Sequence, residues 1–469
     1  MSELCFLTIA EASRRIRARS LSPVELCQAY LDRIDAVGSS LDAYILVLRE
    51  QALVEARKAE AEITAGGWKG PLHGIPVGIK DIYDTAGIAT TGHSALCRDR
   101  VPEQDATTVR LLREAGAVIL GKTATWEFAI GGVSFDLPWP PARNPWDTTL
   151  DPAGSSSGSG AAVAAGLCMG AMGTDTGGSI RSPAAWNGIA GLKPTYGLVS
   201  RRGVLPLSFT LDHAGPMCWT AEDCALMMQV LAAHDPQDPG SADPGPIDFT
   251  GTLGGDLAGL RIGVVRHFFE QDAPADTVVL GALEQALGFF QKAGATLKDV
   301  SLAPLETYYD LCALIMGPES FSIHQKSLTG TPELYGAVAR KRIAAGAFIS
   351  GTDYVNALRL RARLVAQAAE VMKEVDVLVM PTRHTPPEAL GQFDTIMGHR
   401  FYTRPFNVLG LPALSVCSGF TGNGLPLSMQ IVGRPFEDAL VLKVGDAFEK
   451  GTAFRQVRPV LQPEAIAAQ

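Results

Sequence analysis

Residues 151–200 read DPAGSSSGSGAAVAAGLCMGAMGTDTGGSIRSPAAWNGIAGLKPTYGLVS. The stretch begins with serine and glycine, continues through small apolar residues and reaches a glycine pair that precedes a serine. The run 154–160 could be a flexible linker, but linkers do not lead directly into buried elements. The apolar stretch 160–173 has about fourteen residues, too few for the roughly 20 that cross a bilayer, and we expect it to form a buried helix.

Two motifs in this stretch admit other interpretations. Residues 154–158 match the G-x-S-x-G turn of α/β-hydrolases, in which Ser156 would be the nucleophile. That turn follows a buried strand, whereas residues 144–153 contain two prolines and two acidic residues. Residues 173–179 lack the lysine of a phosphate-binding loop, because Gly178 stands in its place. We therefore expect neither a nucleophile elbow nor a nucleotide site here.

The glycine pair also supplies a cradle of backbone donors. Four consecutive N–H groups are available there, those of Thr176, Gly177, Gly178 and Ser179. Glycine adopts the positive φ values that such a turn needs, and a helix predicted from IRSPAAW would point its positive end the same way. The pattern predicts a site that stabilises an oxyanion beside a serine hydroxyl.

A serine at such a site needs a base. The eight histidines stand in no recognisable triad context. Lys80 ends the apolar run GIPVGIK (74–80), and burial at the end of a strand would favour its neutral amine. Lysines at strand ends are usually solvated, so on this pattern alone Lys80 is only a candidate base.

The amino-acid composition argues against several classes of protein. The chain has 469 residues, of which 46% are hydrophobic and 19% charged, as expected of a large globular protein. The net charge of −9 offers no footprint for nucleic acid or an anionic membrane. The eight scattered cysteines form no CxxC pair, which argues against zinc or a disulfide framework. Because residues 1–20 also lack an export signal, we expect a cytoplasmic protein with no metal and no cofactor.

The remaining sequence alternates between two kinds of segment. Strands are expected at 75–79, 117–120, 262–265, 375–380, 413–417 and 428–432. Helices are expected in 8–37 (two), 41–65, 105–115, 220–233, 279–294 and 352–374. This alternation predicts an α/β fold with helices flanking a mostly buried sheet. The Pro- and Gly-rich segment 234–260 is either a linker or, as we favour, a surface loop inside one domain.

Several motifs resemble those of a known family. The residues GTDTGGSIRSPAAWNGIAGLKPTYGLVS (173–200) closely resemble the central signature of the amidase signature family, and GIKD (78–81) resembles its lysine motif. Further matches follow the family's order, namely 121–132, 143–147, 211–217, 380–382 and 406–433. The resemblance is strongest from 71 to 217 and weakest from 240 to 375.

The resemblance implies a fold and a domain plan. The family's fold is a large mixed, mostly buried β-sheet flanked by helices on both faces. We expect one domain over 1–469. Its parts would be an N-terminal helical segment (1–65), a catalytic core (66–235), a variable, largely helical pocket region (236–400) and the C-terminal part of the core (401–469).

The resemblance also assigns catalytic roles. The family uses a serine, a second serine preceded by a cis peptide bond, and a lysine, which correspond here to Ser179, Ser155 and Lys80. Asp175 and Arg181 would order the loop around the nucleophile. No metal or organic cofactor is implied. This triad would hydrolyse an amide through an acyl-enzyme, with the oxyanion held by the cradle at 176–179.

Three positions depart from the family pattern, and the pocket is less defined. Ala153 and Ser157 each replace a glycine, and Ala124 stands where asparagine is frequent, so the loops around Ser155 could differ.

Aromatic, Met and Arg residues are candidates to line the substrate pocket, although core packing suits most of them equally well. They are Trp126, Phe128, Tyr309, Met316, Phe321, Phe348 and Arg383.

We therefore expect an amidase that acts on a small-molecule substrate, such as an aryl or acyl amide or a carbamate. A glutaminase subunit of a tRNA-dependent amidotransferase would share the fold and the triad. A non-catalytic binding protein on the same fold is a third alternative. No nucleic-acid or membrane partner is expected, and a homo-oligomer is left open.

Overall fold

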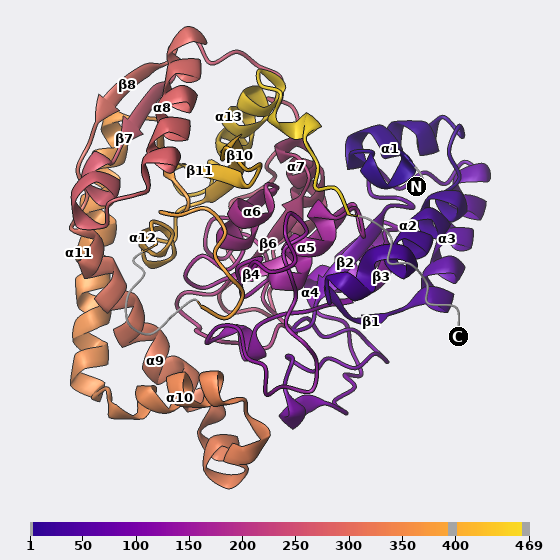
Figure 1. The fold of residues 1–469 in the computed structure, drawn as a ribbon, viewed down its shortest axis with the longest axis horizontal. Coiled ribbons are helices and arrows are strands. Elements are labelled where there is room, and N and C mark those ends of the chain that lie inside the picture. Colours follow the sequence, from indigo (N-terminus) through magenta and orange to yellow (C-terminus); the bar gives the residue numbers. More distant parts are fainter. Residues whose placement is uncertain (1–2, 393–400, 462–469) are drawn as a thin grey trace.

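The fold is built on one mixed β-sheet, seen in a computed structural model that describes residues 3–392 and 401–461. Within these residues the sheet has eleven strands in the order β1-β3-β2-β4-β6-β5-β10-β11-β9-β7-β8. The strands are Tyr44–Val47 (β1), Pro76–Lys80 (β2), Val118–Thr123 (β3), Gly170–Asp175 (β4), Ala190–Lys193 (β5), His213–Cys218 (β6), Arg261–Val264 (β7), Thr296–Asp299 (β8), Val377–Pro381 (β9), Ala413–Phe420 (β10) and Pro426–Val432 (β11). Figure 1 shows this sheet running through the centre of the molecule.

The sheet combines parallel and antiparallel pairing. The group β3, β2 and β4 is parallel, as is the group β9, β7 and β8, whereas β4, β6, β5, β10, β11 and β9 pair antiparallel. Parallel strands need helical crossovers, which cover both faces. β2, β3, β4, β9 and β11 in the interior of the sheet are buried throughout, whereas the edge strand β8 is largely exposed.

The helices lie on both faces of the sheet, as the sequence predicts. They are Ile9–Arg17 (α1), Pro23–Val37 (α2), Arg49–Thr64 (α3), Thr107–Glu114 (α4), Ser157–Ala164 (α5), Arg181–Asn187 (α6), Ala221–Leu231 (α7), Thr277–Lys292 (α8), Leu305–Gly330 (α9), Ala337–Ala345 (α10), Gly351–Glu374 (α11), Arg404–Val408 (α12) and Asp438–Lys450 (α13). On β4, a side chain at Gly173 would meet Ser156 and Ile180 beside α5 and α6, whereas one at Gly170 would meet Met227 of α7. α13 packs with α7, and α9 packs against α10, α11 and α12.

Local sequence explains several helix starts. Ser22 accepts hydrogen bonds from Val24 N (3.0 Å) and Glu25 N (3.2 Å), and Pro23 occupies the first turn of α2. Thr220 caps α7 through Asp223 N at 3.0 Å. The segment between α7 and β7 contains no helix or strand.

Two predicted helices are wrong in part. The helix expected at 41–65 begins only at Arg49, because Tyr44–Val47 pairs antiparallel with β3 as an edge strand. The helix expected at 160–173 ends at Ala164, and β4 begins at Gly170. Residues of β4 are mostly small and carry no β-branched pattern, so tertiary pairing decides their structure.

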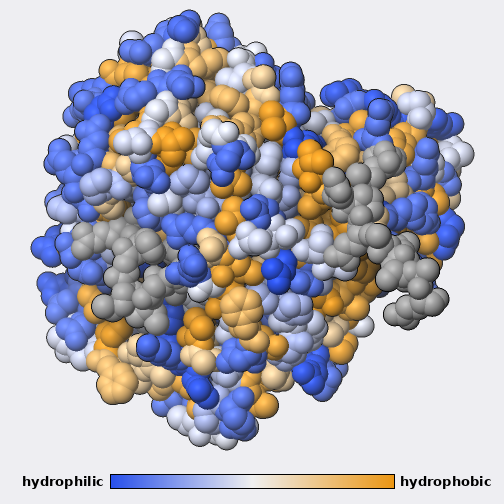
Figure 2. All heavy atoms as spheres, viewed as in Figure 1, coloured by the Kyte–Doolittle hydropathy of each residue, from blue (hydrophilic) through white to orange (hydrophobic). Residues whose placement is uncertain are grey.

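The surface has a mixed character. Figure 2 shows hydrophilic residues interspersed with small hydrophobic areas over the face in view. Among the described residues, no helix has both the length and the apolar character needed to cross a bilayer.

Candidate active site

A buried lysine lies at the carboxyl end of β2. The Lys80 side chain is inaccessible to solvent. Its Nζ lies 2.7 Å from Ser155 Oγ, 3.0 Å from Ser156 Oγ and 2.8 Å from Thr174 Oγ1. Because β2 and β4 run parallel, their carboxyl ends meet here and bring Lys80 beside Thr174. Within the described residues, the amine therefore contacts three hydroxyl oxygens and no carboxylate.

Burial sets the charge of this lysine. Desolvation lowers the pKa of Lys80 from its ordinary 10.5 to about 7, and the negative charges of Asp175 and Asp212 oppose that shift more weakly. A substantial fraction of the amine is then neutral near pH 7. The sequence prediction of a partly desolvated Lys80 agrees with this environment.

The loop that carries Ser155 has an unusual backbone. The Gly154–Ser155 peptide bond is cis, and Ala153 has a φ of 59°. Ala153 thus adopts a left-handed conformation in which glycine would avoid the cost of a Cβ. A Cβ at Gly154 would lie 2.2 Å from Trp126 Cε2, so this glycine is required for close packing against the indole. The Trp126 backbone N–H also donates to Ser155 O at 3.1 Å.

The other two departures from the family pattern have milder consequences. Ser157 begins α5 and needs no positive φ. Ala124 is fixed through its backbone, since its N–H donates to Ala43 O at 2.9 Å and its carbonyl accepts from Gly158 N at 3.0 Å. Backbone hydrogen bonds therefore hold this loop in place without an asparagine side chain.

Ser179 lies at the turn between β4 and α6. Its carbonyl accepts from Ser156 N at 3.2 Å, which ties the two serine loops together. Its side chain is partly exposed, and its hydroxyl has no hydrogen-bond partner among the residues described. Ser179 is thus placed as an accessible hydroxyl beside a buried network.

The backbone cradle around Ser179 differs from the prediction at one donor. Gly178 adopts a φ of 131°, and its N–H donates to Asp175 Oδ1 at 2.6 Å. Gly178 is therefore not a free oxyanion donor, which corrects the prediction of four such groups. The N–H groups of Thr176, Gly177 and Ser179 have no hydrogen-bond partner within the described part of the chain.

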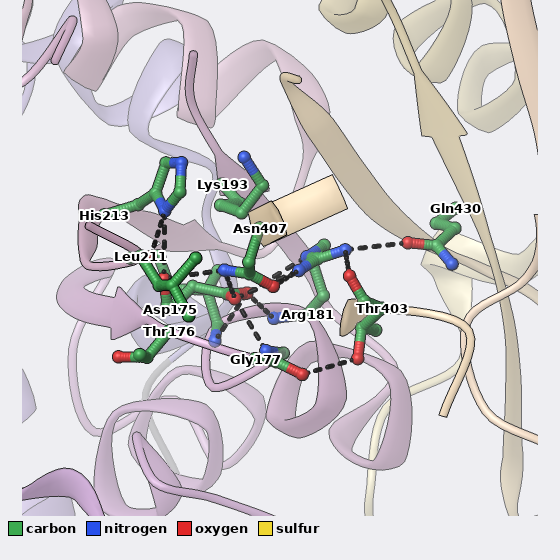
Figure 3. Close-up of polar contacts among 12 residues, drawn as sticks. Asp175, Thr176, Gly177, Arg181, Lys193, Leu211, His213, Thr403, Asn407 and Gln430 are labelled. Carbon is green, nitrogen blue, oxygen red and sulfur yellow. Dashed lines mark hydrogen bonds and ion pairs between the residues drawn. The ribbon is translucent and has the colours of Figure 1, made fainter. Parts of the chain in front are cut away.

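Asp175 and Arg181 form a fully buried ion pair beneath this turn (Figure 3). Arg181 Nε donates to Asp175 Oδ2 and Nη2 donates to Asp175 Oδ1, both at 3.0 Å. The other guanidinium donors reach Asn407 Oδ1 (2.7 Å), Thr403 O (2.9 Å) and Gln430 Oε1 (3.0 Å). All five N–H donors of the guanidinium are thereby used.

This pairing controls the charge and geometry of the turn. Burial alone would raise the pKa of Asp175, but the charge and hydrogen bonds of Arg181, with help from Lys193 and Asn407, hold it well below its usual range. The ionised carboxylate also accepts from Ile180 N at 3.2 Å. The ion pair of Asp175 and Arg181 thus holds this turn in place. Asn407 was missed as a contributor, although it lies in the motif matched at 406–433.

A cavity of about 70 Å³ opens beside Ser179. Three of the predicted pocket residues line it, namely Trp126, Met316 and Arg383. Further residues that the sequence does not predict also line the cavity, among them Leu207, Cys312, Arg342 and Arg404. They come from separate loops and helices that only the fold brings together.

The other predicted pocket residues lie elsewhere. Tyr309 lies behind the lining, with its ring 4.1 Å from Arg404 Cζ. Phe128 is buried against His324 and Tyr335, and Phe321 packs partly buried against the core. Phe348 is 90% exposed and does not line the cavity, which corrects the prediction for this residue. Composition could not distinguish these positions, because an aromatic residue suits a core and a pocket equally well.

Fold and site together define a class of protein. The model of the Amidase family matches residues 25–442. The chain belongs to this family, the amidase signature enzymes. The resemblance to this family, which covers most of the chain and is strongest at 71–217, is confirmed, and so is the expected sheet flanked by helices.

Particular relatives are similar along their whole length. The chain is 39% identical to a glutamyl-tRNA(Gln) amidotransferase subunit of Carboxydothermus hydrogenoformans, over 98% of this chain and 100% of that one. It is also 39% identical to an amidase of Pseudomonas putida, covering 98% and 99% of the two chains. The crystal structure of peptide amidase from Stenotrophomonas maltophilia matches with a TM-score of 0.84 at 30% identity, covering 98% and 99%.

Proposed function

We propose that the chain hydrolyses an amide bond, with Ser179 as nucleophile, Ser155 as proton relay and Lys80 as base. One observation carries this proposal. The buried Lys80 Nζ, whose pKa is about 7, lies 2.7 Å from Ser155 Oγ. A general base works best when its pKa is close to the working pH.

The hydrogen-bond pattern supports a direction for the proton. A neutral amine offers two N–H donors and one lone pair. Ser156 Oγ donates to Thr174 O at 3.2 Å, so its oxygen is left to accept from Lys80. If the second N–H donates to Thr174 Oγ1, the lone pair faces the hydroxyl of Ser155. Ser155 can then donate to Lys80. The Ser179 hydroxyl, which has no partner among the described residues, would turn towards Ser155 Oγ to pass its proton on.

The reaction follows from this relay. As its proton passes through Ser155 to Lys80, Ser179 Oγ bonds to the substrate carbonyl carbon. The carbonyl oxygen becomes an oxyanion, which the N–H groups of Thr176, Gly177 and Ser179 would stabilise. The relay returns the proton to the nitrogen, the C–N bond breaks, and the amine leaves. Water then hydrolyses the ester at Ser179 by the same proton path.

The experiment that tests this proposal combines turnover with labelling. Wild type and Lys80→Ala are assayed on anilides, small amides and a carbamate, with Lys298→Ala, an exposed lysine on β8, as the matched control. We expect turnover to be lost only in Lys80→Ala, with its fold retained by circular dichroism. A fluorophosphonate should label Ser179 of the wild type. Near-native turnover in Lys80→Ala would remove the assigned base, and absence of label on Ser179 would favour the non-catalytic alternative.

A second candidate function is the glutaminase subunit of a tRNA-dependent amidotransferase. The similarity to the glutamyl-tRNA(Gln) amidotransferase chain of Carboxydothermus hydrogenoformans favours it. Such a chain would pass ammonia to partner subunits, so glutamine hydrolysis should be strong only in a complex. Efficient hydrolysis of anilides by the isolated chain would reject it. The eight unpaired cysteines fit the cytoplasmic location that we propose for either function.

A further inference from the structure

The described wall of the cavity carries several positive charges. Arg342, Arg383 and Arg404 all contribute to it, together with apolar and small residues. No Asp or Glu belongs to the part of the lining that the structure describes. The carboxylate nearest to Ser179 in sequence, Asp175, is already paired with Arg181 beneath the turn. A substrate in this cavity therefore meets cations with no acidic counterpart in the described wall.

Arg404 is held against the site by its neighbours. It begins α12, and its Cζ lies 4.1 Å from the centre of the Tyr309 ring on α9. A Cβ built on Gly177 would lie 3.6 Å from Arg404 Nε, which places the side chain directly beside the cradle. Arg404 is partly exposed as a residue, and its guanidinium makes no hydrogen bond or ion pair with another described residue.

Arg181, unlike Arg404, has no N–H donor left to bind a ligand. Arg181 lies on the neighbouring turn with all five donors bound, and it is inaccessible to solvent. The Tyr309 ring lies over the Arg404 guanidinium, whose in-plane N–H donors make no hydrogen bond with a described residue, and Arg404 lines the cavity. Its charge also reaches the cavity wall at Cys312. Burial raises the pKa of that thiol, and the charges of Arg404 and Arg342 oppose the rise.

We propose that Arg404 binds a carboxylate of the substrate, so that this chain selects amides that carry a second, anionic group. The proposal rests on the amide hydrolase activity proposed above. A guanidinium presents paired donors that match both oxygens of a carboxylate, and such bonds are stronger than neutral ones. The stacked ring restricts the side chain in advance, which reduces the entropy lost on binding.

This selection distinguishes a simple acid amide from glutamine. Glutamine carries an ammonium group beside its carboxylate, and the described lining offers that cation no acidic partner. Glutaramate has the same amide and carboxylate without the ammonium. We expect the isolated chain to hydrolyse glutaramate more efficiently than glutamine.

The test compares matched neutral and anionic amides. On the acyl side, glutaramate is paired with 5-methylhexanamide, in which an isopropyl group replaces the carboxylate. On the amine side, N-acetyl-β-alanine is paired with N-isopentylacetamide. We expect kcat/KM to favour the anionic member of one pair by about 10- to 100-fold in the wild type. The pair that shows the preference identifies which side of the substrate carries the carboxylate.

Variants then assign the preference to one residue. Arg404→Leu should reduce the preference to below about threefold, and Arg404→Lys should retain part of it, since lysine keeps the charge without the fork. Arg359→Leu, which removes an exposed arginine of α11, should keep the full preference. Equal losses of kcat/KM on both members in Arg404→Leu would overturn the proposal and indicate a role in oxyanion stabilisation.

Protection of Ser179 from labelling in the wild-type protein tests the carboxylate site without any substitution. 5-Oxohexanoate should protect Ser179 from the fluorophosphonate at a concentration about tenfold lower than 6-methyl-2-heptanone does, because this neutral ketone carries an isopropyl group in place of the carboxylate. Equal protection, or a preference for neutral amides with turnover intact, would overturn the carboxylate site while leaving the hydrolase proposal in place. Absence of both labelling and turnover would instead overturn the hydrolase proposal.

Discussion

Replacing Lys80 by methionine should change how stability depends on pH. In the unfolded chain this lysine binds its proton below its ordinary pKa of 10.5, whereas in the folded chain it does so only below about 7. Between these values unfolding takes up one proton, so Lys80 destabilises the fold increasingly as the pH falls from 10.5 towards 7. The full penalty corresponds to about 5 kcal/mol, at about 1.4 kcal/mol for each pH unit.

Denaturant unfolding of the wild type and of Lys80→Met at pH 7, 8 and 9 gives the necessary comparison. The stability of the wild type relative to the variant should rise by about 2 kcal/mol over this range, most steeply between pH 8 and 9, because about half of the folded amine is still protonated at pH 7. The slope is the readout, because the absolute difference also contains the lost contacts with three hydroxyls. Parallel pH profiles for the two proteins would refute the buried, neutral amine.

Three further substitutions test the surrounding structure. Arg181→Met should lower the free energy of unfolding by about 3–5 kcal/mol in chemical denaturation, because it leaves the Asp175 carboxylate buried without its partner; a loss under about 1 kcal/mol would contradict this pairing. Ala153→Gly should raise stability by up to about 1 kcal/mol, since glycine adopts a positive φ freely, and a lower melting temperature would argue against strain there. Gly154→Ala should reduce activity sharply, because its Cβ would collide with Trp126 and displace the serine loop; unchanged kcat/KM would show that the loop accommodates it.

The sequence predicts the parts of the fold that have a local signature. The sequence predicts β2 and β9 to β11 because they are short apolar runs between turns. β4 was missed because Gly170–Asp175 consists mostly of small residues, and its strand conformation depends on pairing with β2 and β6. β1 was missed because it leads directly into α3, which extends the helical pattern.

The candidate site likewise has parts that a short sequence motif reveals and parts that only the folded chain brings together. The pattern of glycine, serine and lysine around 80, 155 and 179 is contiguous in three short motifs, so resemblance could assign it. The bond from Asn407 to Asp175 joins segments separated by 232 residues, and no spacing rule reveals it. Whether Gly178 N–H faces the substrate or Asp175 is likewise a matter of local geometry. The exposed position of Phe348 and the place of Arg404 in the cavity depend on how α9 to α12 pack.

The most direct measurement of the proposed chemistry is the pH dependence of kcat/KM on a neutral amide. If neutral Lys80 is the base, the rate constant should reach a plateau above its pKa of about 7 and fall about tenfold for each pH unit below it. A profile that stays flat down to about pH 5 would contradict a lysine base with this pKa.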